Sequence, residues 1–142
     1  MMRVFLDTNI LIDIVARRSK FYKAASNVFN LGILGSVELV TTSMSYATCV
    51  YICQREMPYQ DVIMVLQQLD SYVKIAPMNG AQCQRALHAD AVDFEDMLQY
   101  EAALGGGCDV VVTRNGKHFP KDGIPIMTPE QFLQFYMDEE SE

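Results

Sequence analysis

Short apolar runs and longer amphipathic segments alternate along the chain. The runs are rich in β-branched and aromatic residues, which is typical of strands, whereas the longer segments repeat apolar residues at helical spacing. Strands are therefore expected over residues 4–6, 37–42, 73–76, 110–113 and 124–127. Helices are expected over residues 10–15, 21–34, 43–52, 58–69, 79–89, 93–104 and 129–136. Because helical segments separate successive strands, the pattern predicts an α/β fold with a central parallel sheet of about five strands between helical layers.

Residues at the element ends refine this pattern. Thr8 and Asn9 are candidates to cap the first helix, and Ser43 or Ser45 to cap the third, because short polar side chains accept hydrogen bonds from free backbone amides. Pro125 lies in the last apolar run, and proline is tolerated in a strand at the edge of a sheet. The run 124–127 is therefore expected to be an edge strand.

The length of 142 residues fits one domain with one core. The domain is expected to span residues 1–137, followed by a solvated tail over 138–142 that carries the acids Asp138, Glu139, Glu140 and Glu142. The four cysteines form no C-x-x-C pair, and we interpret them as small core residues rather than zinc ligands.

Nothing in the hydropathy pattern indicates a membrane segment. The apolar runs are much shorter than the roughly 18 residues that mark a membrane-spanning helix. The N-terminus also lacks a basic region followed by a long apolar stretch, which would indicate a secretion signal. A cytoplasmic protein without a membrane partner is expected.

Charge limits the partners of the protein. The net charge of −7 argues against tight, sequence-independent binding of nucleic acid, because that affinity comes largely from lysine and arginine at phosphates. Basic residues are nevertheless gathered in two short stretches, one with Arg17, Arg18, Lys20 and Lys23 and the other with Arg114, Lys117 and Lys121. Any affinity for a phosphate chain is therefore expected to come from these two clusters.

The first predicted strand stops abruptly at a carboxylate. Val4, Phe5 and Leu6 form the apolar run, and Asp7 follows at its C-terminal end. In an open parallel sheet, ligands bind beside the carboxyl ends of the strands. A carboxylate there is costly to desolvate unless it is hydrogen-bonded, paired or bound to a metal, so Asp7 is a candidate functional residue. The alternatives are an aspartate that only caps the following helix, or the similar strand-aspartate-helix pattern of phosphotransferases and signalling receivers.

Asp93 and Asp96 form a second acidic group at the start of a predicted helix. They are three residues apart and therefore share one face of that helix, with Glu95 about a quarter turn away. The alternative is again a local role. Acids are favourable in the first turn of a helix, and Asp93 could cap it while Asp96 reaches back.

Three short motifs occur in an order that resembles the PIN domain family. They are Leu-Asp-Thr-Asn at residues 6–9, Asp-Phe-Glu-Asp at 93–96 and Val-Thr-Arg-Asn at 112–115. The segments 42–47 and 124–133 extend the likeness to nearly the whole chain. No single motif is highly specific, but their order, spacing and position together are typical of this family.

The resemblance implies a three-layer α/β/α fold and a metal-dependent ribonuclease that acts on single-stranded RNA, with Mg²⁺ or Mn²⁺ as cofactor. It also implies VapC-like relatives, in which the nuclease is the toxin of a bacterial toxin–antitoxin pair. The expected partners are therefore RNA, an antitoxin protein and a second copy of the chain.

The acidic pocket of the family carries over to Asp7 and Asp96 as catalytic residues and metal ligands, with Asp93 as a nearby catalytic acid. Two positions depart from the family pattern. Thr48 stands where a glutamate is usual, and Asn115 stands where an aspartate is usual. Both supply oxygen without charge, whereas hard divalent cations prefer carboxylates, so one well-held metal ion is expected, with Asn115 assisting catalysis.

Polar and basic neighbours are the expected substrate contacts: Thr8, Asn9, Thr48, Thr113, Arg114 and Lys117. His118 lies at the expected pocket edge and is given no catalytic role. Loss of the two family carboxylates leaves open a catalytically weakened module that binds RNA or protein. A phosphatase of the haloacid dehalogenase type, with Asp7 as nucleophile, is a more distant alternative, because that family needs a second aspartate where this chain has Asn9.

Overall fold

The chain folds around a parallel sheet, described in a computed structural model that covers residues 1–141. Its strands are β1 (Arg3–Leu6), β2 (Glu38–Thr41), β3 (Val73–Ile75), β4 (Val110–Val112) and β5 (Ile126–Met127). They follow the order β3-β2-β1-β4-β5, and each neighbouring pair is parallel. The predicted α/β fold is thereby confirmed over these residues, and the last strand lies at an edge as expected.

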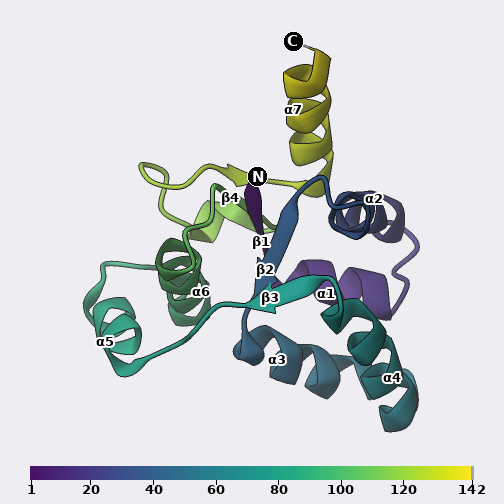
Figure 1. Cartoon of the computed structure of the whole chain (residues 1–142). Helices are drawn as coiled ribbons and strands as arrows, with labels where there is room; N and C mark the ends of the chain where they lie inside the picture. Colours follow the sequence, from purple (N-terminus) through teal and green to yellow (C-terminus); the bar gives the residue numbers. More distant parts are fainter. Residues whose placement is uncertain (142) are drawn as a thin grey trace.

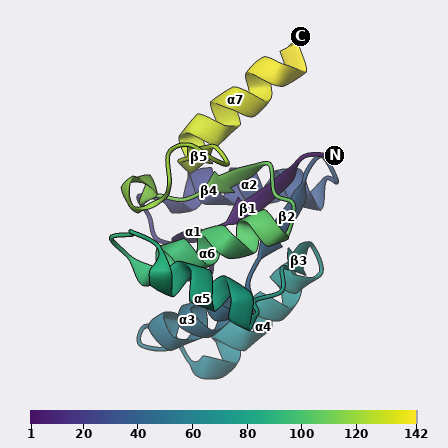
Figure 2. The same cartoon turned by 90° about the vertical axis from the view of Figure 1, so that its left-hand side faces the viewer.

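Helices cover both faces of the sheet. They are α1 (Thr8–Val15), α2 (Tyr22–Ile33), α3 (Ser43–Cys53), α4 (Tyr59–Asp70), α5 (Gly80–His88), α6 (Phe94–Gly105), the short 3₁₀ turn η1 (Gly116–His118) and α7 (Pro129–Ser141). In Figure 1, α5 and α6 lie to the left of the sheet and α1, α2 and α4 to the right, and Figure 2 shows α6 in front of the strands. This is the predicted three-layer α/β/α arrangement. Over residues 1–141, none of the helices combines the length and the apolar character of a membrane span.

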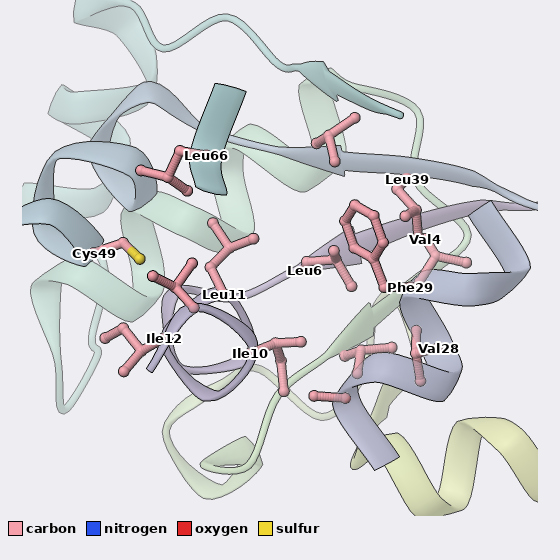
Figure 3. Close-up of a cluster of buried hydrophobic side chains, with 14 of the residues drawn as sticks. Val4, Leu6, Ile10, Leu11, Ile12, Val28, Phe29, Leu39, Cys49 and Leu66 are labelled. Atoms are coloured by element: carbon pink, nitrogen blue, oxygen red, sulfur yellow. The ribbon is translucent and has the colours of Figure 1, made fainter. Parts of the chain in front are cut away.

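Alternation along the strands divides the core between the two faces of the sheet. Val4 and Leu6 of β1 pack with the side chains of α1, α2 and α3, as Figure 3 shows. Phe5 belongs to the second group, on the face covered by Tyr100 and its neighbours on α6. Because both faces of β1 are fully buried, the strand is held rigidly, and so is the residue that follows it, Asp7.

The caps of α1 and α3 are Asp7, which was already an alternative for this role, and Thr42, which was not predicted. Asp7, instead of Thr8 or Asn9, caps α1, because its backbone is extended and its side chain accepts a hydrogen bond from the next amide. Thr42, instead of either predicted serine, caps α3 by accepting a hydrogen bond from the amide three residues later. In both cases the cap follows the strand directly, so the helix begins as soon as the chain leaves the sheet.

The C-terminal helix continues through the segment that was expected to be a tail. The acids at 138–140 are exposed residues of α7, which runs to Ser141. Figure 1 shows the helix extending away from the sheet. Glutamate is a good helix former, so these acids can be solvated without ending the helix. Glu142, the last residue of the predicted tail, lies outside the described residues.

Candidate functional site

The carboxyl ends of neighbouring strands meet at one cavity. Leu6 of β1 stands opposite Val112 of β4, so the residues that follow these strands, Asp7 and Thr113, lie side by side. Strand ends and helices α1, α3 and α6 supply its lining, namely Asp7, Thr8, Asn9, Ile12, Met44, Thr48, Glu95, Asp96 and Gln99. We call this space the acidic cavity. The fold thus brings together predicted site residues that are far apart in the sequence.

Asp7 is buried beneath the acidic cavity. One oxygen of its carboxylate accepts hydrogen bonds from the Thr8 backbone amide at 2.8 Å and from the Gln99 side chain at 3.3 Å. The other oxygen accepts from the Thr113 hydroxyl at 2.8 Å and from the Asn9 side chain at 3.5 Å. Burial raises the pKa of Asp7, while the hydrogen bonds, led by that from Thr113, oppose the rise. Neutral donors therefore fix the position of this carboxylate.

Gln99 joins α6 to the starts of α1 and α3. Its side-chain nitrogen lies 3.3 Å from Asp7, 3.2 Å from the Thr8 hydroxyl and 2.5 Å from the Ser45 hydroxyl. Its side-chain oxygen accepts a hydrogen bond from the Thr42 hydroxyl at 2.7 Å. Since Gln99 is almost completely buried, these contacts are shielded from water and hold the starts of α1 and α3 against α6 around Asp7.

Asp93 and Asp96 stand at the start of α6. Asp93 caps the helix by accepting a hydrogen bond from the Asp96 amide at 2.9 Å, which is the capping half of the local alternative, while the Asp96 side chain faces His118. The Asp96 carboxylate is partly buried and lies 3.3 Å from Nδ1 of His118. Burial, together with the negative charges of Asp7 and Asp93, raises the pKa of Asp96 to about 6. These carboxylates repel one another unless a cation or a proton neutralises them.

A divalent cation fits a donor group that adjoins the acidic cavity and shares Asp96 with its lining. Asp93, Asp96 and His118 each offer one ligand atom, and the three atoms lie within 4.8 Å of one another. Carboxylate oxygens are the ligands that Mg²⁺ prefers, and Mn²⁺ takes both carboxylate and imidazole ligands. The charge of Asp7 is close enough to influence the pKa of Asp96. The donor set is therefore compatible with the predicted cofactor, but it combines Asp96 with Asp93 and His118 and does not include Asp7, the other predicted ligand.

Thr48 and Asn115, the two positions where the resemblance leads us to expect an acid, lie close to these acids. Thr48 lines the acidic cavity from α3. Asn115 follows β4, its backbone amide donates to the Thr113 hydroxyl at 3.0 Å, and its side-chain nitrogen lies 3.2 Å from Nδ1 of His118. Both positions therefore supply neutral polar groups to the same region as the carboxylates.

Arg114 is engaged by a buried acid. Its guanidinium makes two hydrogen bonds with Asp13, at 2.6 and 3.2 Å, and lies 3.9 Å above the ring of Phe21. Asp13 is completely buried, so it depends on Arg114 for a compensating charge. The backbone amide of Arg114 donates to Asn9 at 3.3 Å. Of the two predicted phosphate contacts, Lys117 has an exposed side chain, whereas the guanidinium of Arg114 is already paired with Asp13.

Two residues of this region were not predicted to belong to the site, Gln99 and Asp13, whereas His118 was expected at the pocket edge without a catalytic role. Gln99 follows Asp96 by three residues and so shares its helix face, which was an available signal. Asp13 lies within the apolar face of α1, and a buried charge needs a partner. That partner is 101 residues away in the sequence, so the sequence alone did not identify it.

Comparison with known proteins relates the chain to one family. A family model described as PIN domain matches residues 3–117, a range that includes the whole acidic cavity. The chain is also 25% identical over 137 residues to a protein named Ribonuclease VapC1 from Aquifex aeolicus, and the alignment covers 93% of this chain and 94% of that protein.

Solved structures share the fold. The crystal structure of VapBC2 from Rickettsia felis, bound to a DNA fragment from its promoter, gives a TM-score of 0.62 at 18% identity and covers 89% of this chain and 97% of that chain. VapC20 from Mycobacterium tuberculosis, described as a toxin that cleaves the sarcin-ricin loop, gives 0.64 at 11% identity, with 81% and 92% covered. A toxin–antitoxin complex from Klebsiella pneumoniae gives 0.63 at 20% identity, with 89% and 97% covered.

Proposed function

Because the chain belongs to the PIN domain family, we propose that it is a metal-dependent endoribonuclease that hydrolyses phosphodiester bonds of single-stranded RNA. The observation that carries this proposal is the meeting of Asp7, Asp93 and Asp96 at the carboxyl edge of the sheet, where repulsion between the acids favours a bound cation. The similarity to Ribonuclease VapC1 supports the choice of RNA as substrate. We propose Mg²⁺ or Mn²⁺ as the cofactor, with Asp7 and Asp96 as ligands.

The residues of the cavity divide the work of hydrolysis. A bound divalent cation would supply an activated water and stabilise negative charge on the phosphate. Asp7 is held by Thr113, Gln99 and the start of α1, so it contributes a fixed negative charge at the base of the site. Asp96, which lines the cavity, and Asp93, which caps the same helix, contribute further negative charge. Asn115, without charge, would assist by orienting its neighbours.

Substrate contacts are proposed for the neutral and basic groups around the acids. Thr8, Asn9 and Thr48 line the acidic cavity, and Thr113 contacts Asp7 beside it. Lys117 has an exposed side chain next to His118 and is suited to a phosphate oxygen of the RNA backbone. Arg114 would reach a phosphate only with the part of its guanidinium that Asp13 leaves free.

An antitoxin-type protein is the proposed partner, because two of the similar structures are a VapBC assembly and a toxin–antitoxin complex. The chain offers an apolar groove between α3, α4 and the end of β3, lined by Tyr46, Ala47, Val50, Ile63, Leu66, Gln67, Asp70 and Ile75. A homodimer is also proposed, and an RNA substrate is consistent with action in the cytoplasm. Light scattering of the purified chain would measure the number of copies.

A catalytically weakened binding module is the second candidate. The observation that favours it is the neutral character of Thr48 and Asn115, which reduces the negative charge that holds a cation. In that case the chain would bind RNA or protein without cleaving RNA.

Cleavage of a labelled single-stranded RNA by the metal-free protein, before and after addition of Mn²⁺, tests the proposal. We expect Mn²⁺-dependent cleavage that Asp96→Asn lowers by about a hundredfold or more, because charge on the phosphate is then poorly stabilised. Asp61→Asn is the matched control: Asp61 is exposed and is the third residue of α4, as Asp96 is the third residue of α6. RNA binding without cleavage would favour the binding module, and cleavage that survives both a chelator and Asp96→Asn would overturn the proposal.

A further inference from the structure

His118 stands in an unusual relation to Asp96 and Asn115. Its Nδ1 atom lies 3.3 Å from a carboxylate oxygen of Asp96 and 3.2 Å from the side-chain nitrogen of Asn115. A neutral imidazole nitrogen without a proton has one lone pair, so it cannot accept a hydrogen bond from Asn115 and also donate one to Asp96. When Nδ1 carries no proton, its lone pair and the Asp96 oxygen are two electron-pair donors 3.3 Å apart, and a cation bound by both would take that lone pair in place of the Asn115 amide. Two such atoms are suited to share one cation.

The surrounding chain keeps the imidazole at this place. His118 ends the 3₁₀ turn η1, which is separated from β4 by three residues, and the next residue, Phe119, is buried in the core on the α6 face of the sheet. The side chain of His118 is about one-quarter exposed. The imidazole is thus anchored from the backbone side while its edge reaches the carboxylates of Asp93 and Asp96, with which it forms a ligand group.

We propose that His118 is a ligand of the metal ion, and that it makes this site select Mn²⁺ over Mg²⁺. The side chains of Thr48 and Asn115 carry no charge. Their neutrality should weaken the binding of Mg²⁺ most, because this hard ion depends on carboxylate oxygens. An imidazole nitrogen adds affinity for transition metals, which bind nitrogen ligands better than Mg²⁺ does. The inference deepens the proposed function and rests on the acidic cavity being its metal site.

Pulsed electron paramagnetic resonance of Mn²⁺ bound to the full chain, without RNA, tests the ligand directly. We expect the spectrum to contain the coupling of a directly bound ¹⁴N nucleus. That coupling should disappear in His118→Ala and persist in His88→Ala, the matched control, because His88 is the other histidine of the chain and lies exposed on α5. A parent spectrum without directly bound nitrogen would overturn the proposal, even if the His118→Ala variant failed to fold.

Affinity measurements test the selectivity. We expect His118→Ala to weaken Mn²⁺ binding by about tenfold or more and to change Mg²⁺ binding far less. Loss of a residue that only hydrogen-bonds to a metal ligand already lowers metal affinity by about tenfold, and loss of a ligand should cost at least as much. An equal loss for both ions would contradict the selectivity. These measurements involve no RNA, so they are independent of the proposed activity: a nitrogen-ligated Mn²⁺ site without RNA cleavage would refute the ribonuclease and leave this inference standing. Metal-dependent RNA cleavage by a site without a nitrogen ligand would instead support the ribonuclease and refute this inference.

Discussion

On the β1 side of the acidic cavity, Asp7 is buried and accepts hydrogen bonds from four neutral groups, whereas on the α6 side Asp96 is partly exposed and lies beside an imidazole. The β1 side is built from a strand that is packed on both faces. The α6 side is built from the first turn of a helix and from a short 3₁₀ turn. Two carboxylates of one cavity thus have different surroundings.

The difference indicates a division of roles. Asp7 has its oxygens occupied by donors that cannot move without disturbing α1, α3 and β4, so its position is fixed before any ligand arrives. Asp96 has a pKa raised to about 6 by burial and by its acidic neighbours, so its negative charge is relieved by a proton or a cation. We infer that the β1 side keeps the geometry of the site fixed, and that the charge on the α6 side changes when Asp96 binds a proton or a cation.

The largest effect on stability is expected from Arg114→Ala. The change removes the guanidinium that pairs with the fully buried Asp13, and breaking a buried pair typically lowers the free energy of unfolding by about 3–5 kcal/mol. Lys117→Ala, an exposed position in the neighbouring turn η1, should change the free energy of unfolding by less than about 0.5 kcal/mol. Urea denaturation measures both. Equal, small losses would show that the ion pair does not support the β1 side.

Gln99→Leu is expected to lower the free energy of unfolding by a smaller amount, about 1–3 kcal/mol. The variant keeps a similar volume but leaves buried polar groups of Asp7 and Thr42 without one of their partners. Gln84→Leu serves as the control, because Gln84 is exposed in the middle of α5. If Gln99→Leu were as stable as the parent, the buried amide would not be what holds the helix starts together.

The smallest effect concerns pH and belongs to the α6 side. The pKa of Asp96 is about 6 in the folded chain and has a model-compound value of 3.8, so the folded state retains a proton that the unfolded state has lost. Stability of the metal-free protein from this group is therefore present at low pH and is lost as the pH rises through about 6. Denaturation midpoints measured in a chelator should show this decline in the parent and a flatter profile in Asp96→Asn. Parallel profiles would contradict the raised pKa.

The comparison also explains what the sequence could predict. The strands over 4–6 and 110–113 were recognised because apolar runs are local signals, and their parallel pairing followed from the helices between them. Asp7 and Asp96 could be proposed because one ends a strand and the other opens a helix.

The contacts that distinguish the two sides could not be predicted in this way. Gln99 reaches Asp7 over 92 positions and Arg114 reaches Asp13 over 101, and no local pattern encodes such pairings. Asp7 was interpreted as either a site residue or a helix cap, and the structure shows that it caps α1 and also lines the cavity.

Thermal unfolding of the metal-free chain with increasing Mn²⁺ tests most directly whether the acidic cavity is a metal site that depends on its α6 side. A cation that binds the folded state alone adds about 2.7 kcal/mol at a hundred times its Kd, which corresponds to a rise in Tm of about 5–10 °C for a chain of this size. We expect this rise in the parent and in Asp61→Asn, and its loss in Asp96→Asn. An equal rise in the parent and in Asp96→Asn, or no rise in the parent, would contradict the account.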